Sequence, residues 1–150
     1  EFRRVLFRSP FNSTTNPKSI PGSVQNYRLR VTNQGTGPVD NDSLVVIDAM
    51  PAGTDLRVAD FGTPGSGPVA FSDGSPSSAL SYSFTAFGSS TDSLDFSNDG
   101  GATWTYVPVT DANGTDPAIT HLRVRPIGTM AANTGAGDPW FELQFRVRIE

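Results

Sequence analysis

The chain has 150 residues, no cysteine and a net charge of −4 at pH 7, and its length suits a single domain with its own core. The absence of cysteine excludes disulfides, a thiolate nucleophile and cysteine-ligated zinc. After residue 9 there is no cluster of Lys and Arg, and the longest apolar run, residues 44–47, is short. We therefore expect neither nucleic-acid binding nor membrane insertion.

Residues 1–9 differ in composition from the rest of the chain. They contain three arginines and no glycine, whereas Gly, Pro, Ser and Thr punctuate everything that follows. Their back-translation resembles a widely used sequencing-library adapter. We therefore expect residues 1–9 to be a non-native, adapter-derived segment to be set apart from the fold, with any signal peptide of the natural protein missing from this fragment.

The first elements after this segment are a lead-in and three predicted strands. Residues 10–22 form the polar lead-in, which ends in a Pro-Gly turn signal. Residues 24–33 alternate apolar and polar side chains, the period-two pattern of a half-buried strand. Further strands are predicted at residues 44–49 and 55–61, each followed by a Gly/Pro turn.

The second half of the chain is predicted to continue as short strands. In residues 141–150 five apolar side chains alternate with five polar ones, so a one-residue slip in register would expose the whole apolar row. No segment sustains a helical period. Roughly eight or nine short strands between turns predict an all-β, immunoglobulin-like antiparallel β-sandwich, one domain over residues 23–150. The remaining strands are predicted at residues 69–71, 80–85, 94–96, 104–106 and 119–125.

Two motifs near the start of the domain carry a family resemblance. A Lys-led lead-in, residues 18–23, precedes a Tyr-containing strand that ends in Val31-Thr32-Asn33-Gln34-Gly35, and residues 46–53 read Val-Ile-Asp-Ala-Met-Pro-Ala-Gly. Over residues 17–53 the chain resembles the conserved-repeat family of prokaryotic surface proteins, the domain of unknown function numbered eleven. The resemblance implies an immunoglobulin-like fold, secretion to the bacterial cell surface, neighbouring repeat domains in the same chain, and no catalytic residues.

A turn motif follows the strand at residues 94–96. Ser97, Asp99, Gly101 and Trp104 match the Ser-x-Asp-x-Gly-x-Thr-Trp pattern known as the Asp box, which in sialidases and related propellers is a structural hairpin. Its carboxylate accepts backbone N–H bonds, its glycine takes a positive φ and its tryptophan packs beneath the turn. A propeller requires repeated blades, and this chain has no internal repeat. We therefore expect a structural hairpin within the sandwich.

A second loop places three oxygen-bearing side chains around a glycine. Asp111, Asn113 and Asp116 are candidate calcium ligands, but calcium takes six to eight oxygens. Loop carboxylates elsewhere, such as Asp73 or Asp92, would have to complete the site. The alternative is a solvated Asx turn, in which Asp111 bonds to its own backbone.

The remaining candidate residues point away from catalysis. His121 is the only histidine, and no Gly-x-Ser-x-Gly nucleophile elbow accompanies it. Lys18 is the only lysine and lies where an isopeptide-forming lysine would lie, but the last strand contains no Asn to join it. We therefore expect neither an enzyme nor an isopeptide bond.

Two functions remain open for such a domain. The first is a structural spacer repeat of a secreted or cell-surface protein. The second is an adhesion module that binds a surface glycan or a protein, with or without calcium. Trp104, Tyr106 and Trp140 would offer a sugar-stacking platform if they shared an exposed face, and core packing is the alternative for all three.

Overall fold

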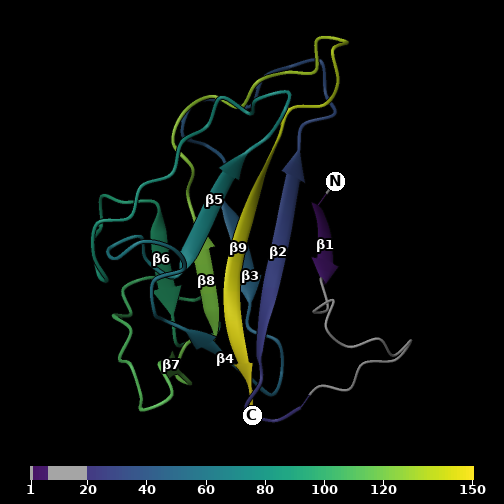
Figure 1. Ribbon diagram of the computed structural model, residues 1–150. Coiled ribbons are helices and arrows are strands. Elements are labelled where there is room, and N and C mark those ends of the chain that lie inside the picture. The colour runs from purple at the N-terminus through teal and green to yellow at the C-terminus, as the bar shows by residue number, and fades with distance from the viewer. Residues whose placement is uncertain (1, 7–19) are drawn as a thin grey trace.

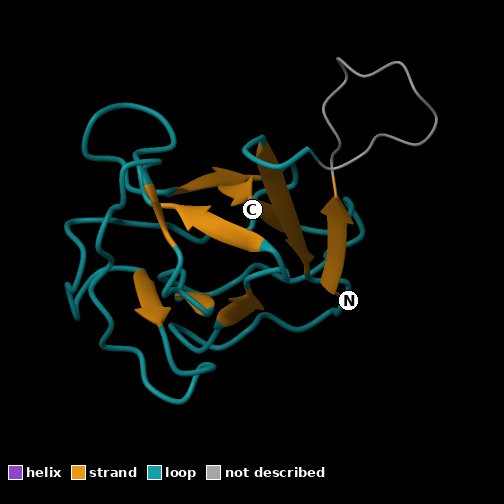
Figure 2. Ribbon diagram, turned by 90° about the horizontal axis from the view of Figure 1, so that it is seen from below, coloured by secondary structure: helices purple, strands orange, loops and turns teal. Residues whose placement is uncertain are grey.

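The computed structural model describes residues 2–6 and 20–150. Within these residues the chain is all-β, with nine strands in two antiparallel sheets that share one core, so the predicted fold class is confirmed (Figure 1, Figure 2). The same residues contain no helix long and apolar enough to cross a membrane. The strands are β1 (Phe2–Leu6), β2 (Val24–Thr32), β3 (Val46–Ala49), β4 (Thr54–Arg57), β5 (Val69–Asp73), β6 (Leu94–Ser97), β7 (Thr115–Asp116), β8 (His121–Val124) and β9 (Trp140–Ile149).

Strand β9 organises the larger sheet, whose order is β1-β2-β9-β4-β7 with β5 also paired to β9. It runs the length of the domain between β2 on one side and β4 and β5 on the other (Figure 1). Because its apolar residues alternate with polar ones, one face enters the core and the other faces outward. Strand β2 pairs with its whole length, from Val24 opposite Arg148 to Thr32 opposite Trp140. The fully buried residues of β9 are Phe141, Leu143, Phe145 and Val147.

The smaller sheet has the order β3-β8-β6 and packs its inner face against β9 and β2. Leu94 and Phe96 of β6 and Leu122 and Val124 of β8 are all nearly inaccessible to solvent. The residues between them in sequence therefore point to the outer face of this sheet. That outer face carries the charged residues described below.

Two predicted strands are absent from the described residues. In residues 80–85 the apolar side chains do turn inward, but Ser81 alone forms a bridge, to Ile127. A longer ladder cannot form there because Pro126 has no N–H and the N–H of Arg125 donates to Ser93. In residues 104–106 only Tyr106 pairs, through one bridge to Phe96.

Two strands of the structure were not predicted. Strand β7 is a two-residue pair with β4 that closes the loop proposed above for calcium. Strand β1 lies within the segment assigned to an adapter, and it pairs with the outer edge of β2, from Phe2 opposite Val31 to Leu6 opposite Tyr27. An open sheet edge can pair with almost any extended chain through backbone groups alone. The origin of residues 1–9 therefore stays a prediction.

Candidate functional site

The candidate site is a pocket on the outer face of the smaller sheet. Strands β6 and β8 are antiparallel, and their register places Asp95 directly opposite Arg123. Arg125 follows two residues later, on the same side as Arg123 because side chains alternate along a strand. Three charged side chains from two strands are thereby brought together over the sheet.

Asp95 holds both arginines. Its Oδ2 atom accepts hydrogen bonds from Nε of Arg123 at 3.0 Å and from Nε of Arg125 at 2.9 Å. Arg125 also donates through Nη2 to Oδ1 of Asp95 and to the carbonyl oxygen of Asp92. The Asp95 side chain is only 7% exposed, whereas those of Arg123 and Arg125 are 24% and 36% exposed. Two guanidinium groups against one carboxylate leave the site with a surplus positive charge.

The indole of the site comes from the turn after β6. Ser97 and Asp99 hydrogen-bond to each other, and Oδ1 of Asp99 also accepts the N–H of Thr103 at 2.9 Å. Gly100 and Gly101 both have positive φ, 77° and 87°, which permits the tight reversal. The four Asp-box residues thus lie in one hairpin that carries Trp104 back over the sheet.

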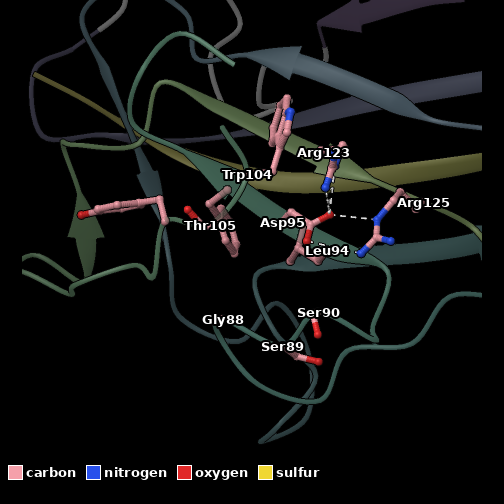
Figure 3. A pocket seen from close by; sticks show the side chains of 11 residues that line it. Gly88, Ser89, Ser90, Leu94, Asp95, Trp104, Thr105, Arg123 and Arg125 are labelled. Atoms are coloured by element: carbon pink, nitrogen blue, oxygen red, sulfur yellow. Dashed lines mark hydrogen bonds and ion pairs between the residues drawn. The ribbon is translucent and has the colours of Figure 1, made fainter. Parts of the chain in front are cut away.

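The hairpin sets Trp104 against the charged triad. The guanidinium of Arg123 lies over the indole, 4.7 Å from its centroid, a cation–π contact that fixes both groups. Between them and the loop before β6 is a pocket of about 310 Å³, which we call the Trp104 pocket. Figure 3 shows Trp104 on one side of it, Ser89 and Ser90 on the other, and Asp95 with its two arginines between them.

Tyr106 contributes its ring to the pocket and keeps its hydroxyl engaged elsewhere. The hydroxyl donates to Oδ2 of Asp116 at 2.9 Å. Burial and this hydrogen bond both raise the pKa of Tyr106. The same Asp116 oxygen accepts the N–H of Val109 at 2.7 Å. Asp116 therefore ties the segment after Trp104 to β7 and supports that wall of the pocket.

The pocket is equipped for binding. It offers an aromatic face, guanidinium donors, serine hydroxyls and a volume at the small end of the range for ligand sites. Its one carboxylate, Asp95, is engaged by two arginines. Paired free acids, as in glycosidases, are not found among the residues that line it.

The proposed calcium ligands are structural groups of their own loop. Asp111 accepts the N–H groups of Asn113 and Thr115, at 2.9 and 2.8 Å, and these bonds, that from Thr115 first, lower the pKa of Asp111. The carboxylate of Asp116 accepts hydrogen bonds from the hydroxyl of Tyr106 and from the N–H of Ala118 in its own turn. In the described part of the chain no group of three His, Cys, Asp or Glu is placed to hold a metal ion. The geometry thus favours the Asx-turn alternative, and calcium stays a prediction without support here.

Asp73 and Asp92 lie apart from that loop. Asp73 accepts hydrogen bonds from the hydroxyls of Ser77 and Ser78. Asp92 accepts the N–H groups of Thr85 and Leu94. Each carboxylate therefore organises its own turn.

The three aromatic residues do not form one platform. Trp104 and Tyr106 line the pocket, whereas Trp140 lies on the outer face of the other sheet, where the guanidinium of Arg30 is 3.8 Å from a ring centroid. Tyr106 packs against the core, but neither tryptophan belongs to it. The expectation of core packing was therefore wrong for Trp104 and Trp140, because arginines rather than apolar side chains cover their rings.

The single histidine does not line the pocket. His121 begins β8, and its Nδ1 atom lies 3.2 Å from the Thr120 hydroxyl. A Cβ on Gly101 would lie 3.7 Å from its ring, so the imidazole packs against the Asp-box turn. Lys18 lies outside the described residues.

Sequence reasoning missed the charged half of the pocket. Asp95 stands between two core residues of β6, which is a signal, because a carboxylate there has to find a partner on the outer face. Arg123 and Arg125 alternate with core residues of β8 in the same way. What the sequence does not reveal is that β6 and β8 are neighbours.

No protein-family model, no curated protein and no solved structure matches this chain. The resemblance to the conserved-repeat surface family therefore remains a prediction.

Proposed function

We propose that this domain is a non-catalytic binding module of a secreted or cell-surface protein, and that it takes a saccharide in the Trp104 pocket. The observation that carries the proposal is the juxtaposition of an indole with two arginines and a carboxylate around about 310 Å³ of space. A sugar presents apolar C–H groups to an aromatic ring and hydroxyls to charged groups. The pocket offers both kinds of contact, with Ser89 and Ser90 at its rim.

The rigidity of the site supports a binding role. Trp104 is held by the Asp-box turn, and Arg123 is held by Asp95 and stacked on the indole. Side chains that are already ordered lose little conformational entropy when a ligand arrives. A pre-organised pocket of this size favours a ligand of one or two sugar rings.

A glycan array, followed by titration calorimetry on each positive glycan, tests the proposal. Trp104→Ala should weaken binding about tenfold or more, which is about 1.4 kcal/mol or more of binding free energy, because the ligand loses its stacking partner. The matched control is Trp140→Ala, which deletes the same indole from the opposite sheet and should leave binding unchanged. Thermal melts of both variants separate loss of binding from loss of folding.

The outcome that contradicts the proposal is equally definite. Absence of binding to every glycan, or equal weakening by Trp104→Ala and Trp140→Ala, excludes a saccharide site in this pocket. Repeating the titration with calcium and with a chelator shows whether the metal contributes, and the loop geometry leads us to expect equal affinities.

A second candidate function is the spacer repeat. It is favoured by the structural roles of two residues from the motifs that resemble the conserved-repeat family. Asn33 donates through Nδ2 to the carbonyl oxygens of Gly37 and Ala131 and accepts the N–H of Gly35. Gly53 occupies a turn with φ of 71°. Gly53 forms a turn, and Asn33 both stabilises its own turn and joins it to the segment at Ala131, which are structural roles expected of a scaffold. Recovery of the full parent gene tests this role, which requires tandem copies of the same pattern beside this domain.

A further inference from the structure

The outer face of the larger sheet holds two arginines that face each other without a carboxylate between them. The antiparallel register of β4 and β9 pairs Leu56 with Val147, both in the core. The ladder ends at this pair, and the next residue of each strand, Arg57 and Arg146, turns its side chain outward because side chains alternate along a strand. Like charges directly opposite each other on a sheet repel. Burial first, and then the charge of Arg57, lower the pKa of Arg146.

Arg57 has no partner within the described part of the chain. Its Nε atom is shielded from solvent and has no hydrogen-bond acceptor. Arginine is normally placed where its donors are satisfied by a carboxylate, a phosphate or backbone oxygens. The guanidinium of Arg57 thus has one buried donor without an acceptor among the described residues, and its Nη groups remain free to bind an anion beside the second arginine.

The acidic residues of the flanking loops are committed elsewhere. The two carboxylate oxygens of Asp60 accept the N–H groups of Gly67 at 2.8 Å and Gly65 at 2.9 Å. On the other side of β4, Thr115 of β7 pairs with Arg57. The carboxylate of Asp111 accepts the N–H and the hydroxyl of this Thr115. Neither acid neutralises the arginine pair.

Arg146 is already oriented. Its Nη2 atom donates to the carbonyl oxygen of Asp60, and its guanidinium lies 4.9 Å from the ring centroid of Phe61. A guanidinium fixed by a backbone oxygen and an aromatic ring retains donors for a second acceptor. The same loop that engages Asp60 thus also positions Arg146.

We propose that Arg57 and Arg146 form an oxyanion-binding site, which takes a carboxylate or sulfate group between the two guanidinium groups. The bound anion removes the repulsion between the arginines and supplies acceptors for Arg57. The site lies on the sheet opposite the Trp104 pocket and does not depend on it. Free inorganic sulfate and the acidic groups of a polysaccharide share this chemistry.

The first experiment is thermal unfolding in sodium sulfate and in sodium chloride at matched ionic strength, which cancels general screening. Sulfate should raise Tm by a few degrees over chloride, because a ligand that binds only the folded state stabilises it. Sulfate also stabilises folded proteins in general because it is excluded from their surface, so Arg57→Gln should keep only that smaller, general gain. In chloride alone Arg57→Gln should melt no lower than the parent protein, since it removes a repulsion, so its folding is not in doubt.

The matched control is Arg30→Gln, which removes one arginine that is already paired with Glu142 elsewhere on the same sheet and should keep the full sulfate gain. Equal Tm in sulfate and chloride overturns the proposal. So does a sulfate gain that is as large in Arg57→Gln as in the parent protein.

The second experiment separates the two sources of the anion. Dextran sulfate, polygalacturonate and neutral dextran are titrated against the parent protein and Arg57→Gln. A Kd per acidic group at least about tenfold lower than that of free sulfate, lost in Arg57→Gln, identifies an acidic polysaccharide as the ligand. An equal Kd, also lost in Arg57→Gln, identifies a site for small anions. Binding that Arg57→Gln leaves unchanged overturns the assignment to this pair.

Discussion

The hydroxyl of Ser97 donates a hydrogen bond of 2.6 Å to Oδ1 of Asp99, and the Oγ atom of Ser97 itself accepts the N–H of Gly101 at 2.9 Å. Ser97 is inaccessible to solvent. One buried hydroxyl therefore joins the end of β6 to both the carboxylate and the backbone of the turn that carries Trp104. The shape of the pocket wall depends on this contact.

Ser97→Ala should lower the free energy of unfolding by about 1–3 kcal/mol, because the N–H groups of Gly101 and Asp99 lose an acceptor that water cannot easily replace. Urea denaturation measures the loss. The control is Ser83→Ala, whose side chain is exposed and should change stability by no more than about 0.5 kcal/mol. Equal effects of the two substitutions would show that the Ser97 hydroxyl is not structural.

Acid should destabilise the domain through two turn carboxylates. The pKa of Asp99 is lowered well below the ordinary 3.8, first by the Ser97 hydroxyl and then by Thr103, and the pKa of Asp111 is lowered by its bonds from Thr115 and Asn113. A depressed folded-state pKa means that the unfolded chain binds the proton more readily. The resulting stability is fully present above the unfolded pKa and is lost as pH falls through the folded one.

Urea denaturation at a series of pH values from 7 down to about 2 tests this sign. Stability should be nearly level above the ordinary Asp pKa of 3.8 and decline below it. Asp99→Asn should be less stable than the parent protein at pH 7, and its stability should decline less in acid. Parallel pH curves for the two proteins would contradict the assignment to Asp99.

The sequence predicted the sandwich because burial and alternation are local properties. In β9, Phe141 and Phe145 lie four positions apart and so on the same face, and both are fully buried as expected. Alternation alone does not predict pairing. Leu80 is buried as the pattern indicates, but its segment forms only one bridge to the segment beside it. In that neighbouring segment Pro126 has no N–H, and the N–H of Arg125 already donates to Ser93.

The site was predictable only in part, for a related reason. The Asp-box spacing identified the turn that carries Trp104, since the bonds from Gly101 to Ser97 and from Thr103 to Asp99 each join residues four positions apart. The partner of that indole, Arg123, is 19 residues away along the chain and reaches it because β6 and β8 pair. Contacts across a sheet depend on strand order, which a single sequence does not reveal.

Ala79→Gly should stabilise the domain. Ala79 has a φ of 63°, a left-handed conformation that costs an L-residue roughly 1–2 kcal/mol and glycine almost nothing. Part of the gain is offset by the greater freedom of glycine in the unfolded chain, so a net increase of about 0.5–1 kcal/mol is expected in urea denaturation. Ala86→Gly, at a residue without positive φ, is the control and should be destabilising. A loss of stability in both variants would show that Ala79 is not strained.

The ion pairs of Glu142 provide the last prediction. Its side chain is 6% exposed and contacts Nε of Arg28 at 3.0 Å and Nη2 of Arg30 at 3.5 Å, while these arginines are 36% and 48% exposed. Loss of one partner from a fully buried pair costs about 3–5 kcal/mol, but arginines at this exposure can turn to water. Glu142→Gln should therefore cost about 1–2 kcal/mol in urea denaturation.

Salt provides the control for that prediction. The stability difference between the parent protein and Glu142→Gln should shrink as sodium chloride rises to about 1 M, because mobile ions screen half-exposed pairs. Glu142→Ala should cost more than Glu142→Gln, since it also removes the acceptor of the Gln144 amide. A loss of 4 kcal/mol or more in Glu142→Gln that is insensitive to salt would show that the pair behaves as buried. In that case Arg30, stacked on Trp140, would be held too firmly to reach solvent.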